Sequence, residues 1–297
     1  METKQPSDFL KRIRELTIRA LFSDDILKDV LILKGGNLID IIYGVSSRSS
    51  MDLDFSIEKD LKRSESKKLK ERMEKTLSET LSIDGLYVFD VRVRNRPSRK
   101  PVKQEAFWGG YEIEFKVIDQ DKHNELGDCL DSLRRNAAVV SPGQKRKLFI
   151  HISKFEYCAN KEKRELGGII ISVYSPIMVI CEKLRAICQQ RPEYRRIVPS
   201  HSRTERARDF LDIYDLFSSF KIEWGSKKNN DILRSIFEAK RVPIGYLKKI
   251  HIDKAFHGHG YEAVKATVHA GVELRDFGYY FEFVLKKCKD LETLGIV

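Results

Sequence analysis

The sequence predicts an α+β protein built from two parts, and two patterns of hydrophobicity carry that prediction. Up to about residue 175, stretches that alternate apolar and polar side chains, as half-buried strands do, are interleaved with stretches of helical period. From Pro176 onward only the helical period remains. At 297 residues the chain is long enough for two domains. We therefore expect an α/β domain over residues 1–170 and a mainly helical domain over residues 171–297.

The first elements of the α/β part surround a pair of glycines. Residues 8–22 have apolar side chains at helical spacing and predict an amphipathic helix. The short apolar run VLIL then leads into Lys34-Gly35-Gly36, and a buried helix that ends near Gly44 is expected to follow. Residues 50–57 predict a half-buried strand with Met51, Leu53, Phe55 and Ile57 on one face and Asp52, Asp54 and Ser56 on the other.

The remaining elements follow from the same two periods. Residues 67–81 predict a helix, and a strand follows in which Tyr87, Phe89, Val91 and Val93 share one face. Two prolines in a basic stretch predict a loop over residues 94–103. Further strands are expected at 111–117, 148–157 and 168–174, the last two joined by a charged turn at 161–165. The helical part should contain helices at 177–187, 210–217, 230–240, 243–256 and 275–290.

The composition limits the partners and the compartment. A formal net charge of +11 favours a polyanionic partner, and nucleic acid is the commonest one inside a cell. No apolar run approaches the roughly 20 residues that span a bilayer, and the N-terminus lacks the apolar core of a signal peptide. Five widely spaced cysteines without a CxxC motif favour reduced thiols. We therefore expect a cytoplasmic protein with no membrane partner.

Two carboxylates on the strand after the glycines are the first candidates for a functional role. Asp52 and Asp54 project from the same face because they are two residues apart on a strand. Such a pair repels unless a cation lies between its members, and Mg²⁺ prefers one or two carboxylates plus substrate phosphates. A lone DxD is more often two harmless acids on a solvent-facing strand, so this motif alone does not define a site.

The glycine pair changes that balance. Glycines before a helix let the backbone approach a ligand closely, and the helix N-terminus offers N–H donors to phosphate. Gly35 and Gly36, a helix, and then Ser50, Asp52 and Asp54 on the next strand form a more specific pattern than either motif alone. A phosphate-binding backbone turn that faces a pair of metal-binding carboxylates is the least that phosphoryl or nucleotidyl transfer requires.

These motifs also resemble a known family. K-G-G-x-L-x-x-x-x-Y-G followed by S-x-D-L-D-F is similar to the AbiEii/AbiGii-type (MenT-like) toxins of the polymerase-β-like nucleotidyltransferase superfamily. The family's (D/E)K(L/F)xA helix resembles the stretch Glu182–Ala186, and its RDxxDxxxL helix resembles Arg208–Leu216. The match keeps the family's order from about residue 30 to residue 220, and the last 75 or so residues share only its helical character.

The resemblance implies a fold and a set of roles. The fold would be a polymerase-β-like core, a mixed sheet with flanking helices, completed by the helical domain at the active-site cleft. Asp52, Asp54 and Glu114 would hold Mg²⁺ (or Mn²⁺), with Glu112 as the alternative third acid. Asp212, or alternatively Asp209, would lie at the active site. The NTP would be bound by Gly35, Gly36, Ser50, Lys183 and Arg185, and by Asn37, which stands where many members have Thr or Ser.

Two basic clusters are candidates for nucleic-acid contacts, with solvated loops as the alternative. The first runs from Arg92 to Lys103, close to Trp108. We favour the second because it joins the two motif helices; its expected contact residues are Arg191, Arg195, Arg196 and Arg203. The sequence His257-Gly258-His259-Gly260 could suggest a metal site, but no Cys or acid stands at ligand spacing, so a flexible turn is expected.

The leading hypothesis is a metal-dependent nucleotidyltransferase with Asp52, Asp54, Glu114, Lys183 and Asp212 as its catalytic residues. It would transfer an NMP from an NTP to an acceptor hydroxyl and release pyrophosphate. The resemblance implies an RNA acceptor, expected to be a tRNA 3′ end, and a toxin restrained by a cognate antitoxin. The alternatives are transfer to a protein or a small molecule, and a non-catalytic module that binds nucleotide or nucleic acid.

Overall fold

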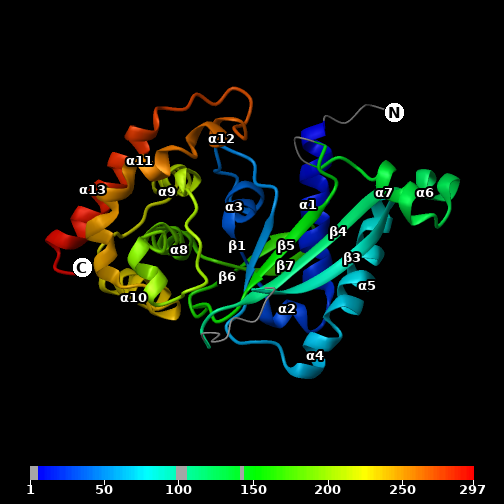
Figure 1. The fold of residues 1–297 in the computed structure, drawn as a ribbon, viewed down its shortest axis with the longest axis horizontal. Helices are drawn as coiled ribbons and strands as arrows, with labels where there is room; N and C mark the ends of the chain where they lie inside the picture. The colour runs from blue at the N-terminus through cyan, green and yellow to red at the C-terminus, as the bar shows by residue number, and fades with distance from the viewer. Residues whose placement is uncertain (1–5, 98–105, 141–143) are drawn as a thin grey trace.

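The computed structural model describes residues 6–97, 106–140 and 144–297. It confirms the predicted α+β class: a seven-stranded mixed sheet with flanking helices is followed by a helical region (Figure 1). The boundary between domains at residue 170 stays a prediction. In the described part of the chain, no helix is long and apolar enough to cross a membrane.

The sheet has the strand order β3-β4-β5-β2-β1-β7-β6. Strand β1 pairs in parallel with β7, and β2 pairs in parallel with β5, while the other neighbours are antiparallel. The bounds are β1 Ile32–Lys34, β2 Leu53–Ser56, β3 Leu86–Arg96, β4 Gly110–Asp119, β5 Leu148–Ser153, β6 Glu162–Leu166 and β7 Ile169–Val173.

Helices cover both faces of the sheet. Phe22 of α1 meets Phe55 of β2 with ring centroids 6.2 Å apart, so α1 covers the apolar face of β2, and α5 packs beside α1 against β3. The helices of the α/β part are α1 Pro6–Ser23, α2 Leu27–Val30, α3 Gly35–Asn37 (continued by a π-helical turn, Leu38–Ile42), α4 Arg63–Lys67, α5 Leu69–Leu81, the 3₁₀ turn Ser82–Asp84, α6 Gln120–Leu126 and α7 Leu130–Asn136.

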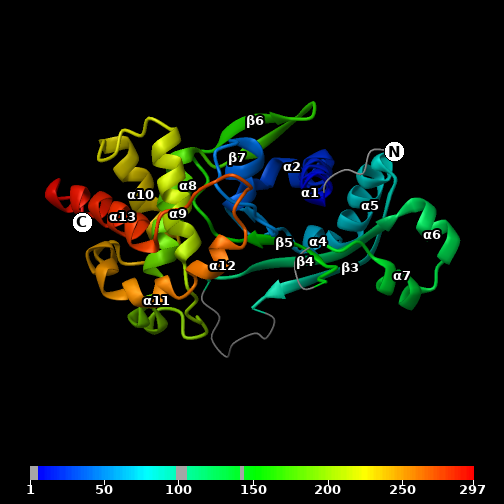
Figure 2. The same cartoon turned by 90° about the horizontal axis from the view of Figure 1, so that it is seen from above.

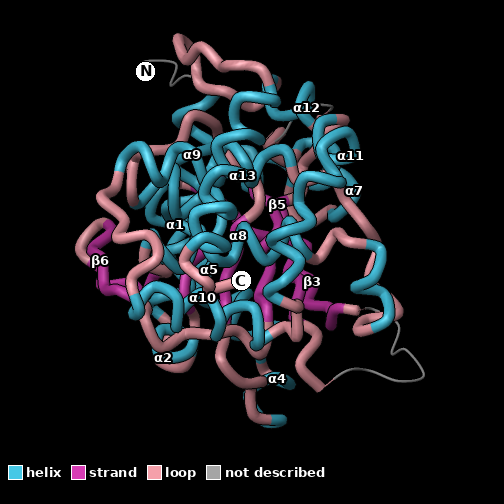
Figure 3. The backbone as a smooth tube through the Cα atoms, turned by 90° about the vertical axis from the view of Figure 1, so that its left-hand side faces the viewer, coloured by secondary structure: helices cyan, strands magenta, loops and turns pink. Residues whose placement is uncertain are grey.

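The C-terminal helices gather on the other side of the sheet (Figures 2 and 3). Lys34 of β1 forms an ion pair with Glu182 of α8, which fixes α8 over the face that also carries Asp54. The elements are α8 Pro176–Cys188, the 3₁₀ turn Pro192–Arg196, α9 Ala207–Ser219, α10 Lys227–Ala239, a 3₁₀ segment Ile244–Asp253, α11 Lys254–Gly258, α12 Tyr261–Lys265 and α13 Phe277–Thr293.

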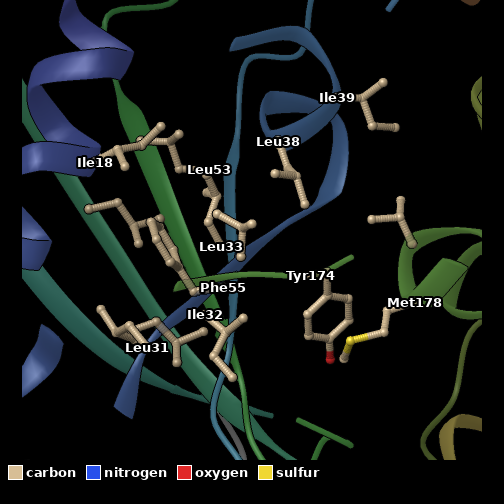
Figure 4. Packing of buried hydrophobic residues seen from close by; sticks show 14 of the residues in the cluster. Ile18, Leu31, Ile32, Leu33, Leu38, Ile39, Leu53, Phe55, Tyr174 and Met178 are labelled. Atoms are coloured by element: carbon tan, nitrogen blue, oxygen red, sulfur yellow. The ribbon is translucent and has the colours of Figure 1, made fainter. Parts of the chain in front are cut away.

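One continuous hydrophobic core runs through both parts. Figure 4 shows Ile18 of α1 close to Leu53 and Phe55, and Tyr174 and Met178 on the side of α8. These side chains are almost fully buried, and burying a side chain of this size stabilises the fold by about 1.5–3 kcal/mol. Packing across the sheet therefore holds α8 in a fixed position relative to β1 and β2.

The predicted alternation of β3 was wrong in its first half. The register of β3 against β4 shifts between Phe89 and Arg92, and Asp90 adopts a positive φ of 56°. The bulge reverses the direction of the side chains. Val88 and Val91 both face the main core, whereas Phe89 packs into a second cluster against α7.

Several other elements also differ from their predictions. The expected charged turn at 161–165 is strand β6, which lies at the edge of the sheet, where charged side chains remain in solvent. The expected helix at 243–256 divides into a 3₁₀ segment and α11. The expected basic loop at 94–103 begins as part of β3, and residues 98–103 lie outside the described residues. Helices α6 and α7 had not been predicted.

Candidate active site

A polar cleft of about 760 Å³ separates the sheet from α8 and α9. This volume falls within the range of roughly 300–1,000 Å³ that is typical of small-molecule sites. In the described part of the chain, eight Lys or Arg side chains and five carboxylates line it, so positive charge is in excess. About half of the predicted site residues line the cleft, together with the alternative Asp209: Gly35, Gly36, Ser50, Asp52, Asp54, Lys183, Arg185 and Asp209.

The glycine pair lies against strand β2. Gly35 has a φ of +72°, and a Cβ at this position would be 2.6 Å from Oδ2 of Asp54. A Cβ on Gly36 would be 2.6 Å from the Cβ of Ser50. Any side chain at either position would therefore displace the residues beside it. This explains why the turn before the helical segment Gly35–Ile42 consists of two glycines.

Replacing Gly35 by Ala should lower transferase activity at least about tenfold, because shifts of about 1 Å in a site can cost a hundredfold. Gly44→Ala is the matched control: Gly44 also has a positive φ, +65°, but nothing lies within 4 Å of its would-be Cβ. Both variants carry the same backbone strain, of order 1–3 kcal/mol. Transfer rates and unfolding free energies of the two proteins check this, and equal activity would contradict the role of the Gly35–Asp54 contact.

The two strand carboxylates have different surroundings. The Asp52 side chain is 52% exposed and lies 4.0 Å from Nε2 of His151. Asp54 is enclosed more deeply. Burial raises its pKa, although the nearby Lys34 and His151 oppose this. Among the described residues, no cationic side chain lies within ion-pair distance of Asp54. An ionised Asp54 therefore has no direct counter-charge there.

A third acid can be sought along the sheet register. Asp54 pairs with His151, which in turn pairs with Glu112, so these three side chains form one row across β2, β5 and β4. Oε2 of Glu112 lies 3.9 Å from Nδ1 of His151. Glu114 is in the next row, opposite Phe149, and Lys147 lies 3.3 Å from it. The geometry favours Glu112 over Glu114 as the acid that assists the aspartate pair.

The donor set suits a metal ion that shares its ligands with a substrate. Among the described residues, no three His, Cys, Asp or Glu side chains are grouped so as to hold a metal ion by themselves. Asp52 and Asp54 alone offer two carboxylates on one face, and Mg²⁺ characteristically binds to one or two carboxylates together with phosphate oxygens. The residues present therefore fit a divalent ion that arrives with a triphosphate.

Lys183 belongs to a buried charge network at the back of the cleft. Its Nζ donates to Oδ2 of Asp212 at 2.6 Å and to Oδ1 of Asp209 at 3.0 Å. Burial lowers the pKa of Lys183, but the two carboxylates outweigh this and raise the pKa above its ordinary value, which favours the charged ammonium. Arg48 donates to both Asp212 oxygens, at 3.0 and 2.7 Å. Asp209 lines the cleft, whereas the fully buried Asp212 lies behind it and holds both cations in place.

A second network of buried charges also lines the cleft. Arg185 donates to Glu156 at 2.7 Å and to Glu182 at 3.2 Å, and Lys34 lies 3.3 Å from Glu182. Lys240 is the third cation, and burial lowers its pKa to about 8. The Arg185 guanidinium is thus already bound to two carboxylates. The roles of Lys34, Arg48, His151 and Lys240 had not been predicted, although Lys34 and Arg48 adjoin the glycine and serine motifs.

Asn37 does not present its amide to the cleft. Its side chain is fully buried, with Nδ2 donating to the Asp52 carbonyl at 2.7 Å and Oδ1 accepting from Arg14 at 2.9 Å. The expected phosphate contact of this side chain was therefore wrong. Asn37 instead ties the first helical turn to the chain just before β2, which fixes the distance between the glycines and the aspartates.

The second basic cluster divides into structural and accessible arginines. Arg191 is buried and donates to Asp253 at 2.7 Å, and Arg203 donates to the same carboxylate at 2.9 Å. These two hold the loop before α9 against the 3₁₀ segment, which makes them poor nucleic-acid ligands. Arg195 and Arg196 are exposed but do not line the cleft. The exposed Arg208 does line it, and it has no ion pair within the described ranges.

His257 is a buried structural residue, so the expected flexible turn was wrong at this position. It lies in α11, and its Nδ1 accepts a hydrogen bond from the backbone N–H of Arg206 at 3.2 Å. Burial lowers the pKa of His257 to about 4. The neutral ring thereby supports the chain at the start of α9, next to the cleft.

Protonation of His257 should destabilise the protein in acid. Its pKa is lower in the folded state than the ordinary 6.5, so its stabilisation is complete above pH 6.5 and is lost as the pH falls toward 4. The loss is at most about 3 kcal/mol. In His257→Gln, the unfolding free energy should fall less between pH 6.5 and 4 than in the wild type. Parallel pH profiles of the two proteins, from denaturant unfolding, would contradict this.

These features define a class of enzyme. Paired carboxylates that face a glycine-rich helix start, with cations across the cleft, are the arrangement expected for phosphoryl or nucleotidyl transfer. The sequence profile of the nucleotidyl transferase AbiEii toxin family, a type IV toxin–antitoxin system, matches residues 18–283. The chain belongs to that family and is a nucleotidyltransferase toxin of the type IV class, which confirms the predicted resemblance and the predicted enzyme class.

Solved structures give distant matches. JHP933 from Helicobacter pylori is 16% identical, with a TM-score of 0.47 over 98% of this chain and 96% of that one. A candidate nucleotidyltransferase from H. pylori is 17% identical, with a TM-score of 0.48 and coverage of 97% and 98%. An antigenic nucleotidyltransferase-like protein from Paracoccidioides brasiliensis is 14% identical, with a TM-score of 0.37 and coverage of 89% and 95%. A comparison with curated proteins gave no match.

Proposed function

We propose that this protein transfers a nucleoside monophosphate from an NTP to a hydroxyl of an RNA acceptor, with a tRNA 3′ end as the expected acceptor. The observation that carries the proposal is the cleft in which Asp52 and Asp54 lie beside Gly35 and Gly36 and across from Lys183. The antitoxin of the system is the expected partner that restrains the activity, and the cytoplasm, which supplies NTPs and tRNA, is the expected place of action.

The side chains on the sheet would bind the triphosphate. Asp52 and Asp54 would hold Mg²⁺ (or Mn²⁺), which when bound neutralises charge on the phosphates. The absence of side chains at Gly35 and Gly36 lets the backbone lie directly beside Asp54 and Ser50, where the phosphates would bind, and Ser50 offers a hydroxyl. The geometry supports Glu112 as the assisting acid because it shares a sheet row with Asp54 and His151.

The helical side would provide fixed positive charge. Lys183 is held by Asp209 and Asp212, so its ammonium is in place before the reaction begins, as electrostatic stabilisation of a transition state requires. Arg208, which lines the same cleft, adds an exposed guanidinium. The acceptor oxygen forms a bond to the α-phosphorus and its proton passes to water, while the bond from that phosphorus to the bridging oxygen breaks and pyrophosphate leaves.

An RNA acceptor is supported by charge. The chain carries a formal net charge of +11, and the cleft itself has more cations than carboxylates. Cations along a binding surface attract the phosphates of nucleic acid, independently of its sequence. A small uncharged acceptor would gain nothing from this surplus, whereas a protein acceptor would tolerate it.

The proposal is tested with each of the four NTPs labelled at the α-phosphate. Purified protein is incubated with one NTP, Mg²⁺ or Mn²⁺, and total tRNA, and the RNA is separated from the protein. Label in RNA is expected from at least one NTP, and the same NTP labelled at the γ-phosphate should give none. No label in RNA across all four NTPs would overturn the RNA acceptor, and label in protein instead would favour the alternative acceptor.

A further inference from the structure

A groove of about 590 Å³ adjoins the cleft at Asp52. It shares Asp52, Arg96 and His151 with the cleft, so the two spaces are continuous at the aspartate. Its floor is formed by β4 and β5. Among the described residues it is lined by Met51, Asp52, Arg94, Arg96, Glu112, Glu114, Val140, Lys145, Lys147, Leu148, Phe149 and His151.

Two aromatic rings lie in this groove without a role in the core. Phe149 and His151 are two residues apart on β5 and project from the same face of the sheet. Their ring centroids are 6.1 Å apart and the ring planes differ by only 3°. Phe149 is partly exposed and belongs to neither hydrophobic cluster of the described residues. A partly exposed Phe opposite a carboxylate suggests a ligand that covers it.

Cations form the rim of the groove, and acids lie beneath them. The side chains of Arg94, Arg96 and Lys147 are 49%, 58% and 44% exposed, and Lys145 is exposed as well. Glu112 and Glu114 are almost fully buried and pair with these cations from below. The buried acids fix the positions of the positive heads, which still face solvent and remain able to contact phosphate.

We propose that this groove binds the last nucleotides of the RNA acceptor, with a base stacked on Phe149 and His151 and the backbone phosphates on Arg94, Arg96 and Lys147. Single-stranded RNA is recognised in this way, by aromatic platforms beside phosphate-binding cations. The inference rests on the proposed function and adds the route by which the acceptor enters.

The position of the groove fits the geometry of the reaction. The attacking hydroxyl and the departing pyrophosphate must lie roughly in line on opposite sides of the α-phosphorus. The glycines and Lys183 line the main cleft but not the groove, and the two spaces meet at Asp52. A 3′ hydroxyl delivered along β5 would therefore approach from the side away from the leaving group.

The test measures the KM for acceptor and for NTP in Phe149→Ala, with total tRNA and an oligoribonucleotide ending in CCA as acceptors. Loss of a stacking residue should raise the KM for acceptor at least about fivefold, as stacking energies of 1–3 kcal/mol per base imply. The KM for NTP should stay within about twofold of the wild-type value. Phe149→Tyr, which keeps an aromatic ring, should stay near wild type.

Two further variants separate stacking from folding and charge. Tyr279→Ala removes an exposed aromatic ring on α13, outside both the cleft and the groove, and should leave both KM values unchanged. Lys147→Gln should weaken binding of RNA. It should also make the slope of log binding constant against log salt concentration shallower by about one, the amount expected for one lost phosphate contact. If the wild type is active, an unchanged KM for acceptor in Phe149→Ala would overturn the proposal that the groove binds the acceptor. A wild type that labels no RNA would overturn the proposed function instead.

Discussion

Asp54→Asn is expected to lose transfer activity by about a thousandfold or more while remaining folded. A metal ion on the phosphates supplies several kcal/mol of transition-state stabilisation, and each 1.36 kcal/mol corresponds to a factor of ten in rate. The substitution keeps the shape of the side chain but removes the charge that would hold the ion. The measurement is transfer of α-labelled nucleotide under saturating NTP and acceptor.

The stability of the same variant provides the control. Burial raises the pKa of Asp54, so its ionised form opposes folding once the pH exceeds the ordinary carboxyl value. Asn at this position should leave the metal-free protein as stable as the wild type, or more so, as is common where function places a charge in an unfavourable setting. An inactive variant that is also less stable would instead indicate that Asp54 supports the fold.

Asp212→Asn should lower the free energy of unfolding by about 3–5 kcal/mol, the usual effect of removing one partner of a buried ion pair. Asp212 is fully buried and contacts Lys183 at 2.6 Å and Arg48 at 2.7 Å, so the substitution leaves two buried cations short of a counter-charge. Activity should fall as well, because both cations would lose their fixed positions.

Asp209→Asn on the same helix is the matched control for this prediction. Asp209 contacts Lys183 at 3.0 Å and Arg206 only at 3.8 Å, and it lines the cleft. Its neutral variant should be destabilised by less than the Asp212 variant, since Lys183 keeps its closer partner. Equal destabilisation in denaturant unfolding would contradict the assignment of Asp212 as the residue that supports the network.

The local motifs of the site could be predicted from sequence because each depends on a few adjacent residues. Glycines before a helix, and carboxylates two apart on a strand, reveal their placement through backbone geometry alone. The prediction that residues on α8 and α9 would join them came from the family resemblance and not from a local pattern. The structure places Gly35, Asp54 and Lys183 in one cleft, as that prediction required.

The partners of these residues could not be predicted, since they depend on register and on packing between distant segments. Glu112 and Glu114 share a face of β4, and only the pairing of β4 with β5 shows which one shares a row with Asp54. Arg48 meets Asp212 across 164 residues of sequence. The inward direction of the Asn37 side chain depends on Arg14, which no local pattern connects with the glycines.

The prediction of which β3 side chains share a face was wrong for a different reason. Tyr87, Phe89, Val91 and Val93 recur at every second position, so periodicity alone places these four on one face. The bulge at Asp90 is stabilised by ion pairs with Lys116 and Arg134, at 2.7 and 3.0 Å, and these partners lie on β4 and α7. Long-range charge pairing thus decided a backbone conformation that the local sequence did not indicate.

The most direct test of the central claim, that this cleft makes the protein a toxin by catalysis, is growth of a host cell that expresses it without its antitoxin. Wild type and Asp54→Asn are induced to equal levels of folded protein, with Gly44→Ala as a third strain. The structure predicts arrest by the wild type and by Gly44→Ala, and normal growth with Asp54→Asn. Arrest that persists with Asp54→Asn would contradict the claim.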